Sequence, residues 1–117
     1  MTVASKEVGK FTANPYTKDG TVLVSKVNYS DNLKETILKT VNLVGGLSRV
    51  VKKGDEVLLK PNYNSADPPP ASNDPEFLRA VIELLYEHGA GKVVVGESSM
   101  QGLTTRKVME QTEPWRK

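Results

Sequence analysis

Five polar residues follow two strongly apolar runs of this sequence, and their types suit the binding of an anionic small molecule. The runs are Val57-Leu58-Leu59 and Val93-Val94-Val95, and the polar residues are Lys60, Asn62, Glu97, Ser98 and Ser99. A lysine ammonium attracts anions, amide and hydroxyl groups orient a ligand, and a carboxylate can act as a base or a metal ligand. If the fold brings the two runs together, these residues form one site.

Each of these residues also has a structural interpretation. Lys60 can extend its ammonium into solvent from the end of a strand, and Asn62 is equally suited to a turn. Glu97 can be a solvated loop acid that bonds to nearby backbone. The hydroxyls of Ser98 and Ser99 suit a phosphate at a helix start, but their spacing fits neither a P-loop nor a dinucleotide fingerprint, which favours ordinary capping. No nucleophile, base and orienting group complete a catalytic set, so the sequence leaves enzymatic activity open.

The composition excludes several kinds of site. The chain has no cysteine, which rules out disulfides, thiol catalysis and any iron–sulfur cluster or zinc site held by thiolates of this segment. His88, the only histidine, has no cysteine or histidine partner, so we predict no metal site. The identity of any cofactor stays open.

Charge and hydropathy narrow the partners and the location. The 16 basic and 14 acidic residues are interspersed, without the basic stripe that binds phosphate backbones, so we predict no nucleic-acid partner. The longest apolar runs are far shorter than the about 20 residues that span a bilayer, so we predict no membrane contact. Residues 1–20 lack the apolar core of a signal peptide. We therefore expect a cytoplasmic protein with a flexible arm over 1–20 and a single domain over 21–117.

Three strands and three helices alternate in the predicted structure. We expect strands at Thr21–Val27, Glu56–Lys60 and Lys92–Val95, which are rich in apolar and β-branched residues. The first helix starts near Ser30, Asp31 or Asn32 and stops at Gly45-Gly46. The second starts at Asp74-Pro75 and closes at Gly89. A short third helix starts near Thr104 or Thr105.

This alternation predicts an α/β fold. Strands that are apolar on consecutive positions are typical of a parallel sheet covered on both faces. We expect a Rossmann-like, three-layer α/β/α domain with strand order 2-1-3, because the alternative order 3-2-1 would leave one face bare. The carboxyl ends of parallel strands share one edge, where ligands bind, so the five polar residues should meet there. The long polar loop over 62–73 leaves the same edge and is predicted to be a binding loop that is mobile when empty.

The sequence resembles a known family. "VKKGDEVLLKPNYNS", "NDPEFLRAVIELLYEHGAGKVVVGESS" and "TTRKVMEQT" are similar to the amino-terminal part of a prokaryotic family catalogued as domain of unknown function 362. The most specific motifs are Lys60-Pro61-Asn62, Asp74-Pro75 and Gly96-Glu97-Ser98. The resemblance extends from about residue 21 to residue 112.

The resemblance implies a location within a larger protein but no activity. Members of the family are typically longer, and many look redox-associated because they carry a ferredoxin-like four-iron cluster segment. This cysteine-free chain lacks that segment, so we expect a domain fragment. Its expected partners are an anionic small molecule and the remaining part of the full-length protein. The alternative to ligand binding is a non-catalytic module that docks on the rest of a redox protein or on another partner.

Overall fold

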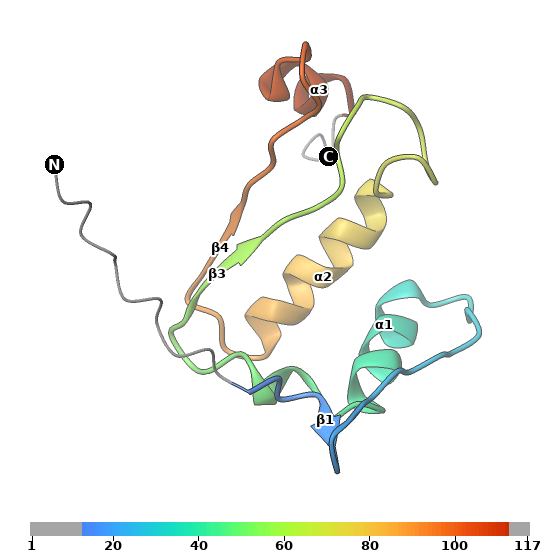
Figure 1. The fold of residues 1–117 in the computed structure, drawn as a ribbon, viewed down its shortest axis with the longest axis vertical. Helices are drawn as coiled ribbons and strands as arrows, with labels where there is room; N and C mark the ends of the chain where they lie inside the picture. The colour runs from blue at the N-terminus through green and yellow to red at the C-terminus, as the bar shows by residue number, and fades with distance from the viewer. Residues whose placement is uncertain (1–12, 113–117) are drawn as a thin grey trace, which may run out of the picture.

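The computed structural model describes residues 13–112 and shows a mixed α/β chain (Figure 1). Its elements are β1 (Thr17–Lys18), β2 (Thr21–Val22), α1 (Leu33–Asn42), a 3₁₀ turn (Leu47–Arg49), β3 (Glu56–Leu59), α2 (Pro75–Glu87), β4 (Lys92–Val95) and α3 (Thr105–Thr112). The α/β class and the three helices expected from the sequence are therefore confirmed.

Local capping signals fix where the two longer helices begin. Asn32 caps α1, since its side-chain oxygen accepts a hydrogen bond from the backbone N–H of Glu35. Asp74 caps α2 in the same way by accepting from the N–H of Glu76, and Pro75 occupies the first helical position. Gly89 then ends α2 with a φ of 101°, a left-handed conformation that glycine adopts without strain.

β3 and β4 form a two-stranded parallel sheet, separate from the β1–β2 hairpin. β3 and β4 are in register from Glu56 opposite Lys92 to Leu59 opposite Val95. Val57, Leu59 and Val93 pack toward α2, against a buried cluster of Val51, Leu85 and Ala90. In Figure 1, α2 runs along one side of this pair and α1 lies beyond α2. The described part of the chain is therefore layered as sheet, α2 and α1.

The expected strand order 2-1-3 is not confirmed, and neither is the Rossmann-like three-layer arrangement. In that order the first strand would separate the other two, but β3 pairs directly with β4. Of the strand expected over Thr21–Val27, only Thr21–Val22 pairs, and it pairs with β1 in an antiparallel hairpin. Asp19 and Gly20, with φ of 52° and 75°, form a tight turn that returns the chain to β1.

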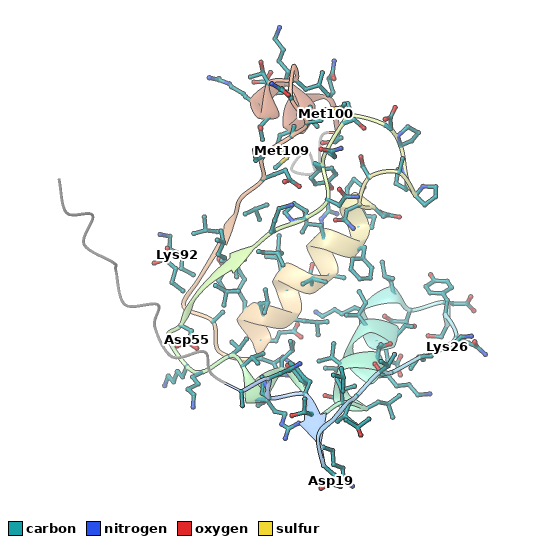
Figure 2. The ribbon with its side chains drawn as sticks, in the orientation of Figure 1. Asp19, Lys26, Asp55, Lys92, Met100 and Met109 are labelled. Carbon is teal, nitrogen blue, oxygen red and sulfur yellow. The ribbon has the colours of Figure 1, made fainter. Side chains whose placement is uncertain are left out.

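The predicted flexible arm over 1–20 falls mostly outside the described residues, because the structure describes none of 1–12. Within the described part of the arm, Thr17–Lys18 forms β1, and Figure 2 places Asp19 at the tip of the hairpin.

Within residues 13–112, no helix or strand covers the outer face of the β3–β4 pair. Leu58 lies at its centre, opposite Val94 on the neighbouring strand, and 72% of Leu58 is exposed. Parallel sheets are normally covered on both faces. We call the residues on this side, Glu56, Leu58, Lys92 and Val94, the outer sheet face.

Three buried clusters hold the helices and the strands together. Ile37, Ala80 and Leu84 join α1 to α2, and the cluster around Leu85 joins α2 to the sheet. The third cluster consists of Tyr63, Leu78 and Val108, and it fixes α3 and the loop after β3 onto the start of α2.

Candidate functional site

Lys60 and Glu97 meet at the carboxyl edge of the parallel pair, as the sequence predicts. The ladder continues one step past the strands, since the N–H of Gly96 donates to the carbonyl of Leu59 at 3.1 Å. This step places Lys60 beside Glu97, and Lys60 Nζ lies 2.8 Å from Glu97 Oε1. The Glu97 side chain is only 2% exposed, whereas that of Lys60 is 68% exposed. The ion pair therefore joins a buried carboxylate to an exposed ammonium group.

Glu97 is held by three donors. Besides Lys60, the backbone N–H of Tyr63 donates to Oε2 at 2.9 Å and that of Ser98 donates to Oε1 at 2.7 Å. Burial acts to raise the pKa of Glu97, but the hydrogen bonds from Lys60, Tyr63 and Ser98 together lower that pKa below its ordinary value. Glu97 is therefore an ionised anchor that ties the loop after β4 to the loop after β3.

The pH dependence of stability should reflect this anchor. Because the pKa of Glu97 is lowered in the folded chain relative to its ordinary value, its ionised form stabilises the fold at neutral pH. The contribution is lost as pH falls through the folded-state pKa. In urea unfolding at about pH 7 and about pH 3, Glu97→Gln should therefore lose less stability on acidification than the natural chain does.

The control for this measurement is Glu56→Gln. Glu56 forms an exposed ion pair with Lys92, with Oε1 2.8 Å from Nζ, so its removal should leave the pH dependence of the natural chain almost unchanged. An acid response that is the same in Glu97→Gln and in the natural chain would contradict the anchor role.

Asn62 forms hydrogen bonds with residues at the other end of its own loop. Its N–H donates to Asn73 Oδ1 and its carbonyl accepts from the N–H of Asn73 at 3.0 Å. Its side-chain Nδ2 donates to the carbonyl of Ala71 at 3.3 Å, and Ser72 Oγ closes the loop further by donating to the carbonyl of Ser65 at 2.9 Å. These bonds favour the structural interpretation of Asn62, in which its hydrogen bonds join the two ends of the loop.

Ser98 and Ser99 differ in their surroundings. Ser98 is exposed, and its backbone bonds to Glu97. Ser99 is half-buried, with Oγ donating to the carbonyl of Tyr63 at 2.8 Å and its N–H donating to Thr105 Oγ1 at 3.0 Å. The Ser99 hydroxyl thus links two loops, while Ser98 is an exposed residue beside the Lys60–Glu97 pair.

Tyr63 is the central residue that sequence reasoning underestimated. It is fully buried, and its hydroxyl has no hydrogen-bond partner among the described residues. Burial, and to a lesser extent the negative charge of Asp74, raises the pKa of this phenol, so the hydroxyl stays neutral. The sequence signal was a lone aromatic residue in a polar loop directly after a strand, which identifies a possible anchor but not its burial.

Two grooves on the described surface lie away from the five predicted site residues, whereas a smaller groove of about 220 Å³ is lined by residues of the 62–73 loop such as Asp67, Pro69 and Asn73. A groove of about 450 Å³ between α1 and α2 is lined mainly by charged residues, including Asp31, Lys34, Glu76, Arg79 and Glu83. An apolar groove of about 330 Å³ lies between α1 and the segment that precedes it, and Val27, Ile37 and Phe77 contribute to its lining. The five predicted site residues line neither groove, so they form an open rim.

Residues 13–112 were also searched for metal-binding side-chain groups and for membrane-spanning helices. This part of the chain contains no group of three or more acidic, histidine or cysteine side chains that could hold a metal ion. It also contains no helix with the length and apolar character needed to cross a membrane.

Comparison with known proteins connects the site to a family. The family model described as "Domain of unknown function (DUF362)" matches residues 57–114, which include both loops of the rim. A "Thylakoid-associated protein", sll1697 of Synechocystis sp., is 33% identical over 87 residues, which cover 73% of this chain and 27% of the relative. The chain thus spans about a quarter of that relative's length. No solved structure matches the chain significantly. The resemblance to the family of domain of unknown function 362 is confirmed over residues 57–114, where all three of its motifs lie.

Proposed function

We propose that this chain is a docking unit whose outer sheet face is covered by another part of a longer protein of the same family. The observation that carries the proposal is the 72% exposure of Leu58 at the centre of a parallel strand pair whose other face packs on the buried cluster of Val51, Leu85 and Ala90. An apolar side chain in that position loses contact with water only when a further layer packs on the sheet.

The surroundings of Leu58 suit an interface. The exposed pair of Glu56 and Lys92 lies at one end of the strands, and the Lys60–Glu97 pair lies at the other. An apolar centre surrounded by charged residues is typical of surfaces that bind protein partners. Gly96 leaves room for the side chain of Leu58, since a Cβ at position 96 would lie 3.2 Å from Cδ1 of Leu58.

The partner we propose is the part of a full-length family member that this chain does not match. That part is large, because the 87 matched residues make up 27% of the cyanobacterial relative. A segment of this size can supply further strands and helices to cover the sheet. The single domain over 21–117, the cytoplasmic location and the redox association expected from the sequence stay predictions.

The test is to express this chain together with the unmatched part of the cyanobacterial relative and to measure how much of that part co-purifies with the tagged chain. Leu58→Glu should lower the yield of the complex at least about tenfold, because a buried unpaired carboxylate is strongly unfavourable at an interface. Leu43→Glu is the matched control, since Leu43 is 62% exposed and lies at the end of α1, away from the sheet. Equal yields for the two variants would contradict the proposal.

A second candidate function is the binding of an anionic small molecule at the rim. It is favoured by the exposed ammonium of Lys60, which lies beside the exposed Ser98. Titration with nucleotides and organic phosphates should then shift the amides of 62–65 and of 96–99 together, and Lys60→Ala should abolish both responses. Shifts that persist in Lys60→Ala would contradict an anion site at this lysine.

A further inference from the structure

A side chain of α2 binds the backbone of β4. The N–H of Val93 donates to the hydroxyl of Tyr86 at 3.1 Å. Tyr86 lies in the last turn of α2 and is 48% exposed. A strand N–H normally bonds to the backbone of a neighbouring strand, so a side chain that accepts this bond takes the place of such a neighbour.

Alternation along β4 shows that this N–H lies on the edge away from β3. In a parallel strand, successive residues direct their backbone groups to opposite sides. The N–H of Lys92 donates to the carbonyl of Asp55, beside β3, at 3.2 Å. The N–H of Gly96 donates to the carbonyl of Leu59, in β3, at 3.1 Å. Val93 has the opposite parity, so its N–H is the group that a further strand beside β4 would bind.

The turn between α2 and β4 fixes where Tyr86 lies relative to this edge. The N–H of Gly89 donates to the carbonyl of Tyr86 at 3.0 Å, which closes the helix at this residue. Gly91 then packs against the turn before β3, since a Cβ at position 91 would lie 2.8 Å from the carbonyl oxygen of Gly54. The start of β4 is therefore held close to the end of α2, within reach of the tyrosine ring.

The hydroxyl of Tyr86 competes with the carbonyl group of any added strand. A carbonyl oxygen in a β-ladder lies about 2.9 to 3.0 Å from the nitrogen that it binds. The Tyr86 oxygen lies 3.1 Å from the nitrogen of Val93 and thus takes nearly the same position. A strand that joined beside β4 would have to displace the hydroxyl before it could bind this N–H.

We propose that Tyr86 closes the outer edge of β4 and makes β4 a terminal strand of the sheet. Open strand edges are templates for pairing with other chains, and native proteins block them with side chains or covering segments. With β4 closed, a strand that extends this sheet joins beside β3 instead. The proposal concerns a strand edge, whereas the docking function concerns the outer sheet face, so neither depends on the other.

Hydrogen exchange of the Val93 amide tests the contact itself. Tyr86→Phe removes only the hydroxyl, so the Val93 amide should exchange about tenfold faster, the factor that one hydrogen bond of ordinary strength represents. The amide of Gly96, which bonds to β3, should keep its rate. Tyr29→Phe is the control, since Tyr29 is 68% exposed and precedes α1. An unchanged Val93 rate in Tyr86→Phe would overturn the proposal.

A second experiment measures whether loss of Tyr86 opens the edge. In sedimentation equilibrium, Tyr86→Ala should associate at a concentration at least about tenfold lower than the natural chain does, whereas Tyr29→Ala should not. Adding Val93→Pro to Tyr86→Ala should restore the natural behaviour, because proline is tolerated at an edge position but cannot donate a hydrogen bond. The proposal would be overturned if Tyr86→Ala associates no more than the natural chain, or if its association persists with Val93→Pro.

Discussion

Replacing Tyr63 by alanine is expected to lower the free energy of unfolding by about 3 to 5 kcal/mol, the cost of removing a fully buried aromatic ring. The ring joins Leu78 of α2 to Val108 of α3, so its loss should loosen both the loop after β3 and α3. Urea denaturation followed by far-ultraviolet circular dichroism would measure the change.

Removing only the hydroxyl of Tyr63 should not lower the free energy of unfolding. It is buried without a hydrogen-bond partner in the described structure, a situation that costs about 1 to 3 kcal/mol. Tyr63→Phe should therefore retain or increase stability by up to about 1 kcal/mol, while Tyr63→Ala is severely destabilised. A large loss in Tyr63→Phe would show that the hydroxyl makes an interaction that stabilises the fold.

Leu84→Ala is expected to cost about 2 to 5 kcal/mol of unfolding free energy, since only 1% of Leu84 is exposed and truncation leaves a cavity between α1 and α2. Leu43→Ala is the control, because Leu43 is largely exposed and its truncation should change stability by less than about half a kcal/mol. A loss in Leu84→Ala as small as that expected for Leu43→Ala would show that the contact between α1 and α2 contributes little to stability.

Local signals in the sequence predicted the elements that depend on local interactions. The caps at Asn32 and Asp74 require only a side chain and the N–H of a residue two or three positions later. Gly89 requires only its own backbone freedom. The meeting of Lys60 and Glu97 was also predictable, because it follows from the general rule that parallel strands end at one edge.

Long-range pairing was not predictable in the same way. A β-branched run such as Thr21–Val27 has the pattern of a strand wherever it pairs, and the turn at Asp19-Gly20 directs it to β1. Leu58 and Leu59 are equally apolar, yet only Leu59 packs against α2, because alternation assigns neighbours to opposite faces. The sequence cannot show that one of these faces lacks a covering layer.

The contacts between the two loops at the carboxyl edge have a consequence for how the chain opens. Glu97 accepts from the N–H of Tyr63, Ser99 donates to the carbonyl of Tyr63, and the N–H of Met100 donates to the carbonyl of Asn64 at 3.0 Å. Neither loop can detach without breaking bonds of the other. The two loops therefore form one cooperative unit, and in native-state hydrogen exchange the amides of Tyr63 and Met100 should report a single shared opening free energy.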